Sequence, residues 1–358
     1  MSSGYGITLS LDDGTAIRMI DQSDMLSAMQ RSPERLRPPP DAESTCHIDS
    51  HLPMNIVFAG VGGSGIVGDI LADYCRDVIR VPTTVCRSLR IPRFVDRNTL
   101  FVAISYSGDT RETLGMFEQA KDAHARLAIV SSGGRLLSQA RADNIPYVKV
   151  TAGMLPRVAL PELIAAMTYA LGKARILEDS RRLLESASIS VNVLIDGLKA
   201  AVPLEQNPAK QVASTLVGHL PLLIGNDENV SVLRRFKNEL NENSKAPAVC
   251  YTLPEAYHDD IEGLKALTEL SKPQPIILRS PSQGGDEQLA AEKLLETLSQ
   301  LGFPQPLFFS GMGDGRFEWL ISAITFGDFV SFYLAVLKGV DPSKLSFIPH
   351  FRAIRGQV

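Results

Sequence analysis

A short glycine-rich stretch, residues 55–69 (NIVFAGVGGSGIVGD), limits the possible folds of this chain more than any other. The apolar residues 56–59 stop at Gly60, and further glycines lead into a second apolar segment. This pattern predicts a buried strand, a glycine turn and the start of a helix. Glycine lets the backbone approach a ligand closely, and the free N–H groups of a helix N-terminus attract anions. Because Ser64 adds a hydroxyl donor at the same point, the stretch is a candidate phosphate site.

The glycine spacing does not by itself identify the phosphate. Gly60, Gly62 and Gly65 match the dinucleotide fingerprint, which expects an acidic residue about 20 positions further on. The corresponding residues 81–90 (VPTTVCRSLR) contain arginines instead. The stretch also lacks the Gly-Lys-Ser/Thr sequence of a nucleotide P-loop, which excludes that motif. The loop alone is therefore either another kind of phosphate site or a plain tight turn.

A second polar stretch, SYSGDT at residues 105–110, follows the apolar strand pattern of residues 99–105. Its hydroxyls and backbone N–H groups suit phosphate oxygens without a basic side chain. The alternative is that Ser107 or Thr110 only caps the helix that follows. The carboxyl ends of parallel strands meet at one edge of a sheet, where such folds bind ligands. We expect the two stretches to converge there, which favours a phosphate site over two unrelated turns.

Strand and helix patterns alternate along the chain, which predicts an α/β fold with mostly parallel sheets flanked by helices. In the first half they alternate at residues 99–105, 110–123, 126–132, 134–142 and 145–150. The second half repeats the order at residues 221–226, 229–245, 275–280, 286–301, 306–309 and 317–337. We therefore expect two similar doubly wound subdomains. The predicted segments are an N-terminal arm (1–50), a first subdomain with bridging helices (51–201) and a second subdomain with a helical tail (202–358).

Composition limits the class of protein. The 358 residues suffice for two domains. A net charge of −4 provides no basic field, so nucleic acid is not an expected partner. The four cysteines form no Cys-x-x-Cys pair, which argues against a zinc site and a disulfide framework. No signal-peptide pattern and no apolar run of about 18 residues is visible, so we expect a cytoplasmic, enzyme-like protein without a membrane segment.

The two polar stretches, in this order, resemble the sugar isomerase (SIS) domain, a phosphosugar-binding doubly wound module. Three further segments resemble the bifunctional phosphoglucose/phosphomannose isomerases: residues 156–162 (PRVALPE), 234–245 (RRFKNELNENSK) and 253–263 (LPEAYHDDIEG). The resemblance extends from about residue 50 to about residue 345. It implies two flavodoxin-like SIS subdomains and an isomerase of hexose 6-phosphates. Such an enzyme interconverts glucose 6-phosphate and mannose 6-phosphate with fructose 6-phosphate through a cis-enediol, with no metal and no cofactor.

The resemblance also implies site residues. The phosphate would be held by loop residues of both polar stretches, namely Gly62, Gly63, Ser64, Ser105, Ser107 and Thr110. The base that moves a proton between C1 and C2 would be Glu242, between two asparagines. For Glu239, three positions earlier, a solvated helix face or a supporting role is expected.

Two further residues are implied in the chemistry. His258 would open the sugar ring and would reach the active site from a partner subunit, which implies a homodimer. Histidine suits this step because its side chain exchanges protons near neutral pH. Arg157 would stabilise the enediolate, the alternative being a surface ion pair.

The C-terminal tail departs from the family pattern. The family has Gly-Val-Asp-Pro followed ten residues later by a lysine that assists ring opening, whereas residues 339–342 of this chain are followed at that position by Arg352. Arginine keeps the charge but stays protonated at neutral pH, so Arg352 or the nearby His350 is left as the candidate. The family threonine linked to mannose substrates falls near Leu345 and Ser346, so mannose 6-phosphate is the less expected substrate.

Two other functions compete with the isomerase. A non-catalytic, phosphosugar-sensing SIS module is compatible with the departures in the tail. No helix-turn-helix or basic region accompanies it, which disfavours a transcriptional regulator. Amidotransferase-type amino-sugar synthesis is disfavoured because no N-terminal cysteine nucleophile or glutaminase domain is recognised.

Overall fold

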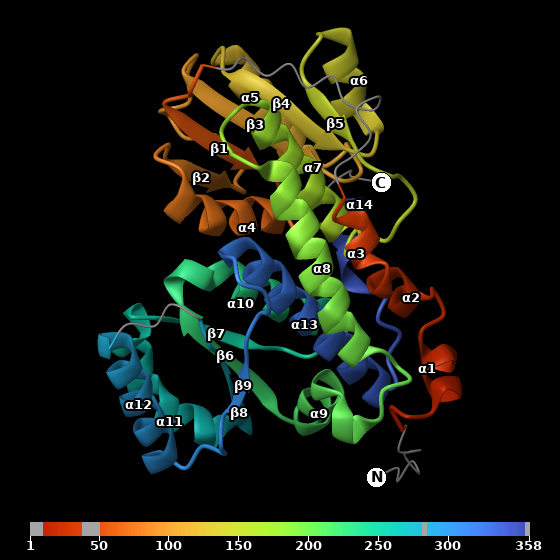
Figure 1. The fold of residues 1–358 in the computed structure, drawn as a ribbon, viewed down its shortest axis with the longest axis vertical. Helices are drawn as coiled ribbons and strands as arrows, with labels where there is room; N and C mark the ends of the chain where they lie inside the picture. Colours follow the sequence, from red (N-terminus) through yellow and green to blue (C-terminus); the bar gives the residue numbers. More distant parts are fainter. Residues whose placement is uncertain (1–9, 38–50, 281–284, 355–358) are drawn as a thin grey trace. The chain divides into compact units, whose positions relative to one another are not determined.

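Two parallel β-sheets, each flanked by helices, make up the protein in a computed structural model that describes residues 10–37, 51–280 and 285–354 (Figure 1). The described chain divides into two compact units, one around each sheet. The five-stranded unit contains residues 31–37, 51–192, 315–318 and 345–354, and the four-stranded unit contains residues 10–30, 193–280, 285–314 and 319–344. The predicted fold class is confirmed.

The five-stranded unit has the strand order β2-β1-β3-β4-β5, and every neighbouring pair is parallel. Its strands are β1 (Asn55–Ala59), β2 (Thr83–Cys86), β3 (Thr99–Ser105), β4 (Arg126–Ser131) and β5 (Tyr147–Lys149). All residues of β3 are buried. A central parallel strand is covered on both faces, which explains why its sequence is apolar throughout and does not alternate.

Helices connect these strands in the crossover arrangement that parallel pairing requires. They are α4 (Gly63–Val78), α5 (Arg111–Asp122), α6 (Gly134–Ala142), α7 (Leu160–Lys173) and the first part of α8 (Ser180–Leu198). One hydrophobic cluster joins strands and helices, with Val57, Phe101, Met116, Phe117 and Ile129 among its members. Because the cluster packs strands against helices, it fixes the positions of the strands and therefore of the loops that follow them.

The four-stranded unit repeats the same topology with the order β7-β6-β8-β9. Its strands are β6 (Leu220–Asn226), β7 (Val249–Leu253), β8 (Pro273–Leu278) and β9 (Leu307–Phe309). Its main helices are α9 (Pro208–Thr215), α10 (Val230–Glu242), α11 (Asp260–Leu270), α12 (Gly285–Gln300) and most of α13 (Arg316–Leu337). In both sheets the second strand lies on one side of the first strand and the remaining strands lie on the other. The predicted duplication is therefore one of topology.

The N-terminal residues are divided between the two units. The helices α1 (Gly14–Ile20) and α2 (Met25–Gln30) belong to the four-stranded unit, whereas α3 (Ser32–Arg35) belongs to the other. Asp12 pairs with the fully buried Lys210 at 2.8 Å, which anchors this segment. The division differs from the predicted segments 1–50, 51–201 and 202–358. Residues 1–9 and 38–50 of the predicted arm lie outside the described residues.

The long apolar helix expected at residues 317–337 is α13, and it bears on the expectation that the chain has no membrane segment. By length and composition, this helix passes as a candidate span. In the structure, 89% of its most apolar window is buried inside the protein, as in the core helix of a globular domain. The predicted cytoplasmic location stays a prediction.

Candidate active site

The strand order of the five-stranded unit fixes where a ligand site belongs. In a doubly wound sheet of this order the ligand binds at the carboxyl edge between the first and third strands, where the chain changes direction. The glycine-rich stretch follows β1 and the SYSGDT stretch follows β3, and these strands pair directly, with Ala59 opposite Ala103. Both polar stretches therefore lie at this position.

The glycine loop (residues 60–65) ends in the N-terminus of α4. Gly62 has φ 58° and ψ −134°, a backbone conformation that side chains disfavour. A Cβ on Gly60 would lie 2.8 Å from the backbone oxygen of Ile104, so this position also needs glycine. The helical hydrogen bonds begin with Gly65 N to Val61 O at 3.3 Å. The N–H groups of the first turn thus face the edge of the sheet, the standard arrangement for binding an anion.

The hydroxyl loop (residues 105–110) is organised around the buried Ser105. Its Oγ lies 3.0 Å from Thr110 Oγ1 and accepts a bond from Gly108 N at 3.1 Å. Ser107 is exposed, and its Oγ accepts a bond from Asp109 N at 3.3 Å. Thr110 occupies the N-cap position of α5, yet its side chain makes no capping hydrogen bond in the described protein. The hydroxyl of Thr110 therefore contacts Ser105 and does not cap the helix.

The two loops are in direct contact. The backbone N–H of Tyr106, in the hydroxyl loop, donates to Ser64 Oγ in the glycine loop at 3.1 Å. Because this bond uses Ser64 Oγ as an acceptor, the hydroxyl proton of Ser64 is available to a further acceptor. The loops together form a cluster of hydroxyl and amide donors without a lysine, which we call the donor cradle.

Arg157 is buried beside this cradle, with 6% of its surface exposed. The backbone oxygen of the preceding Pro156 lies 4.0 Å from the position that a Cβ on Gly63 would take. The alternative of a surface ion pair is wrong, because the side chain is buried. Because Arg157 is buried where its segment borders the cradle, its guanidinium charge would favour an anionic substrate.

Glu242 is the last residue of α10 and is partly buried. The helix is held by a buried polar network between α10 and α13. In this network Arg235 pairs with Glu239 at 2.7 Å and with Asp328 at 2.8 Å. Asn243 then donates to Glu239 Oε2 at 3.0 Å. Glu239 is 1% exposed, so the expectation of a solvated face is wrong for it, and its contacts are those of a supporting residue.

Electrostatics keep Arg235 charged. Burial alone would lower the pKa of its guanidinium, but the charges of Asp328 and Glu239 outweigh burial and raise that pKa. The charge of Glu242 contributes in the same direction. Glu242 therefore lies within the electrostatic reach of this network.

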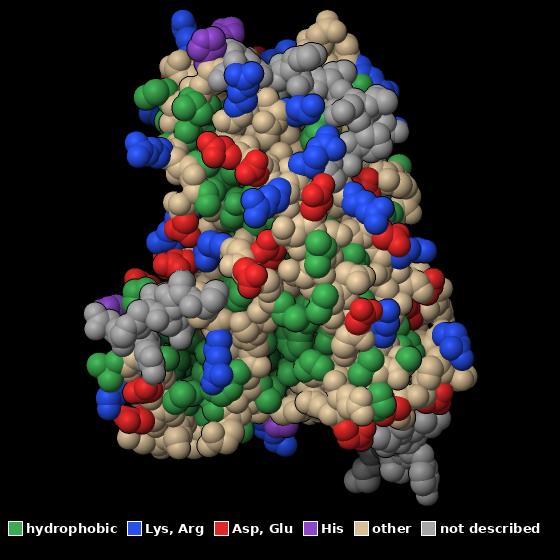
Figure 2. All heavy atoms as spheres, in the orientation of Figure 1, with side chains coloured by type: hydrophobic (Ala, Val, Ile, Leu, Met, Phe, Trp, Pro, Cys, Tyr) green, Lys and Arg blue, Asp and Glu red, His purple; other side chains and the backbone are tan. Residues whose placement is uncertain are grey.

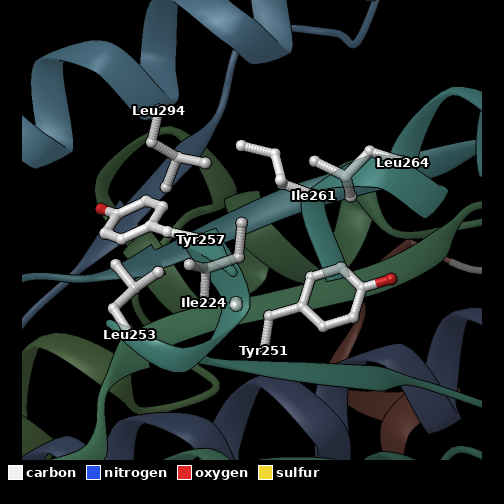
Figure 3. Close-up of a pocket in the computed structure, with 8 residues that line it drawn as sticks. Ile224, Tyr251, Leu253, Tyr257, Ile261, Leu264 and Leu294 are labelled. Atoms are coloured by element: carbon white, nitrogen blue, oxygen red, sulfur yellow. The ribbon is translucent and has the colours of Figure 1, made fainter. Parts of the chain in front are cut away.

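His258 is exposed and follows the short helix η4 (Glu255–Tyr257). A pocket lies under this helix in the same unit (Figure 3). Its lining consists of Ile224, Tyr251, Leu253, Ala256, Tyr257, Ile261, Leu264 and Leu294. These side chains are aliphatic or tyrosine, and a sugar phosphate needs charged or strongly polar partners. The pocket is thus not the candidate substrate site.

The tail residues are described only in part. The backbone of Arg352 lies in α14 (Phe347–Ile354), but its side chain lies outside the described residues. His350 is exposed on the same helix, with its ring 6.1 Å from that of Phe351. Lys245, next to the Glu242 segment, donates to Asp341 O at 2.7 Å and so ties that segment to the start of the tail.

Among the described residues, no group of three or more His, Cys, Asp or Glu side chains is arranged to hold a metal ion. Basic and acidic side chains are interspersed over the face displayed in Figure 2. The structure brings Gly62, Gly63, Ser64, Ser105, Ser107, Thr110 and Arg157 together in one unit, whereas Glu242 and His258 belong to the other.

Three residues that organise the site were missed in the sequence: Tyr106, Arg235 and Asp328. Asp328 had a visible signal, since it is an isolated acid in an apolar helix and such a residue requires a buried partner. Arg235 and Glu239 are four positions apart, the spacing of a helical ion pair. Tyr106 gave no signal beyond its position between two serines.

The strand order and the paired loops at its switch point define a doubly wound module of the SIS type. The family model for the bacterial phospho-glucose isomerase C-terminal SIS domain matches residues 205–354. Bifunctional phosphoglucose/phosphomannose isomerases from Caldicellulosiruptor bescii and Thermoplasma acidophilum are 29% and 31% identical to this chain. Each match covers 82% of this chain and 87% of the relative.

The solved structure of a glucose-6-phosphate isomerase like protein from Thermus thermophilus has the same fold. Its TM-score is 0.64 at 17% identity, over 97% of this chain and 99% of that one. The chain belongs to the family of bifunctional phosphoglucose/phosphomannose isomerases, and it is an isomerase. The expected family and enzyme class are confirmed.

Proposed function

We propose that this protein interconverts glucose 6-phosphate, and mannose 6-phosphate more slowly, with fructose 6-phosphate by a metal-independent cis-enediol mechanism. The observation that carries the proposal is the donor cradle at the β1/β3 switch point with the buried Arg157 beside it. The relatives named as phosphoglucose/phosphomannose isomerases support it. A hexose 6-phosphate is the corresponding substrate.

The phosphate group binds in the donor cradle. Gly62 and Gly63 present the backbone at the start of α4, and Ser64 donates its free hydroxyl proton. Further hydroxyl groups come from Ser105, Ser107 and Thr110. Amide and hydroxyl donors hold a phosphate dianion without neutralising it completely, which permits release of the product.

Proton transfer is assigned to Glu242. Its carboxylate removes the proton from C2 of the aldose, and the electron pair moves to form the enediolate. Return of the proton to C1 on the same face gives the ketose. The guanidinium of Arg157 stabilises the negative charge that develops on the oxygens. This route needs neither a redox cofactor nor a metal.

Ring opening is assigned to His258 of a second subunit in a homodimer. Glu242 precedes β7 and His258 follows it, and a strand of five residues spans about 16 Å. This separation favours a role for His258 in the site of another chain. Arg352 supplies positive charge in the tail, and His350 is its alternative as a proton donor.

A coupled assay tests the proposal. The purified protein is given fructose 6-phosphate, and the formation of each hexose 6-phosphate is followed with and without a chelator. We expect both products, with glucose 6-phosphate formed faster because the family threonine is absent near Leu345 and Ser346. Activity lost to the chelator would contradict the metal-free route. Tight binding of the sugar phosphate without turnover would also contradict the proposal.

A further inference from the structure

We propose that Tyr106 is a positioning residue that ties the Arg157 segment to the phosphate-binding loops. The inference rests on the proposed function, because it assigns a purpose to the location of Arg157. Tyr106 lies in the hydroxyl loop with 9% of its surface exposed. Nothing in the mechanism above requires its side chain to touch the substrate.

Three hydrogen bonds carry the inference. The backbone N–H of Tyr106 donates to Ser64 Oγ at 3.1 Å. Its phenol hydroxyl donates to the backbone oxygen of Thr151 at 3.0 Å and accepts from the backbone N–H of Met154 at 2.7 Å. One residue thus bonds the glycine loop through its backbone and the segment that leads to Arg157 through its side chain.

The segment from Thr151 to Arg157 depends on such bonds because its first part is not held by packing. Residues 151–153 are exposed, and Gly153 has φ 84° with no atom within 4 Å of the position of a Cβ. The segment ends in the buried pair Arg157 and Val158. Hydrogen bonds at its two ends therefore set its path.

Two other ties hold the segment to helices of the same unit. Glu162 Oε1 accepts from Thr151 N at 2.6 Å, and Arg35 Nη1 donates to Val158 O at 2.8 Å. Neither of these two bonds leads to the donor cradle, whereas the bonds of Tyr106 do. Burial raises the pKa of the Tyr106 phenol, so its hydroxyl remains a donor over the working pH range.

The substitution Tyr106→Phe tests the inference because it removes only the hydroxyl. We expect kcat to fall by about 10- to 100-fold, since a misplacement of about 1 Å in a catalytic group has effects of this size. The KM and the competitive inhibition by inorganic phosphate should stay unchanged, because the backbone bond to Ser64 remains. A matched control is Tyr333→Phe, which removes a buried tyrosine hydroxyl that donates to Leu198 O in the four-stranded unit.

A double-substitution cycle separates positioning from a general loss of stability. If Tyr106 acts through Arg157, Tyr106→Phe should cost little in an Arg157→Lys background, because the two losses are not additive. Additive losses, or an unchanged kcat in the single variant, would overturn the inference.

Hydrogen exchange gives a measurement that does not depend on activity. The Met154 amide should exchange faster in Tyr106→Phe and not in Tyr333→Phe, and an unchanged rate would overturn the inference. Wild-type protein without isomerase activity would instead overturn the proposed function. The exchange result would still show whether the Tyr106 hydroxyl holds the backbone of Thr151 and Met154.

Discussion

Arg235 and Asp328 form a two-bond ion pair between α10 and α13, with Nε–Oδ1 at 2.8 Å and Nη2–Oδ2 at 3.0 Å. Arg235 is 2% exposed and also pairs with the buried Glu239. Arg235 lies seven residues, about two helical turns, before Glu242 on α10. The ion pair therefore holds the helix that carries the proposed base.

Removing Arg235 should destabilise the protein strongly. Arg235→Met leaves the buried carboxylate of Glu239 and the partly buried one of Asp328 without their partner, and breaking a buried pair of this kind costs about 3–5 kcal/mol. Urea unfolding followed by circular dichroism measures the change. The control is Lys293→Ala, which removes an exposed ion pair with Glu296, for which we expect a change under about 1 kcal/mol. Similar costs for the two variants would show that the buried network does not stabilise α10.

Glu242→Gln should abolish isomerisation while substrate still binds. The amide has nearly the shape of the carboxylate but cannot accept the proton, and loss of a general base costs about 10²–10⁴-fold in rate. Exchange of solvent deuterium into C2 of the sugar phosphate is the direct measurement. Glu269→Gln, at an exposed position on α11, is the control and should exchange normally. Retained exchange in Glu242→Gln would remove Glu242 from the role of base.

Ser107→Ala should weaken substrate binding more than it slows turnover. A hydrogen bond to a charged group contributes about 1.5–3 kcal/mol, so KM should rise by about 10-fold or more. Steady-state kinetics with fructose 6-phosphate measure this change. Ser138→Ala removes another exposed serine hydroxyl of the same unit, one that donates to Gly134 O on α6, and should leave KM unaltered. An equal KM in the two variants would exclude Ser107 from the phosphate site.

Mixing inactive variants tests whether His258 acts across a dimer. Homodimers of Glu242→Gln and of His258→Ala should each turn over cyclic sugars poorly. In a mixed dimer, one site keeps Glu242 of one chain and His258 of the other, so random mixing should restore about a quarter of the sites. No recovery after verified subunit exchange would place both residues in the site of a single chain. The substitution His258→Ala should slow turnover of an open-chain substrate analogue less than turnover of cyclic sugars.

Features that depend on residues close together in the chain could be predicted from the sequence, and features that depend on distant residues could not. The strand, glycine turn and helix of residues 55–69 were predictable, because apolar runs and glycines act on neighbouring residues. The convergence of the two loops was also predictable, since parallel strands with helical crossovers bring their carboxyl ends to one edge. The N-terminal residues were not, because the burial of Lys210 against Asp12 joins positions far apart in the chain.

The buried ion network shows where prediction from sequence ends. A glutamate on a helix is usually solvated, and the spacing of Arg235 and Glu239, four positions apart, fits an exposed ion pair as well as a buried one. The burial of Glu239 is decided by α13, whose Asp328 lies 93 residues from Arg235. When two charged residues are this far apart in the sequence, tertiary packing determines whether they pair, and a local sequence pattern does not.

The sequence alone determined the doubly wound α/β class, the glycine and hydroxyl stretches and the family resemblance, because each depends on residues close together in the chain. Only the tertiary structure decided that Tyr106 bonds both Ser64 and the segment before Arg157, and that Arg157 and Glu239 are buried. The physical reason is that a side chain's burial and hydrogen-bond partners depend on elements that fold against it from distant positions.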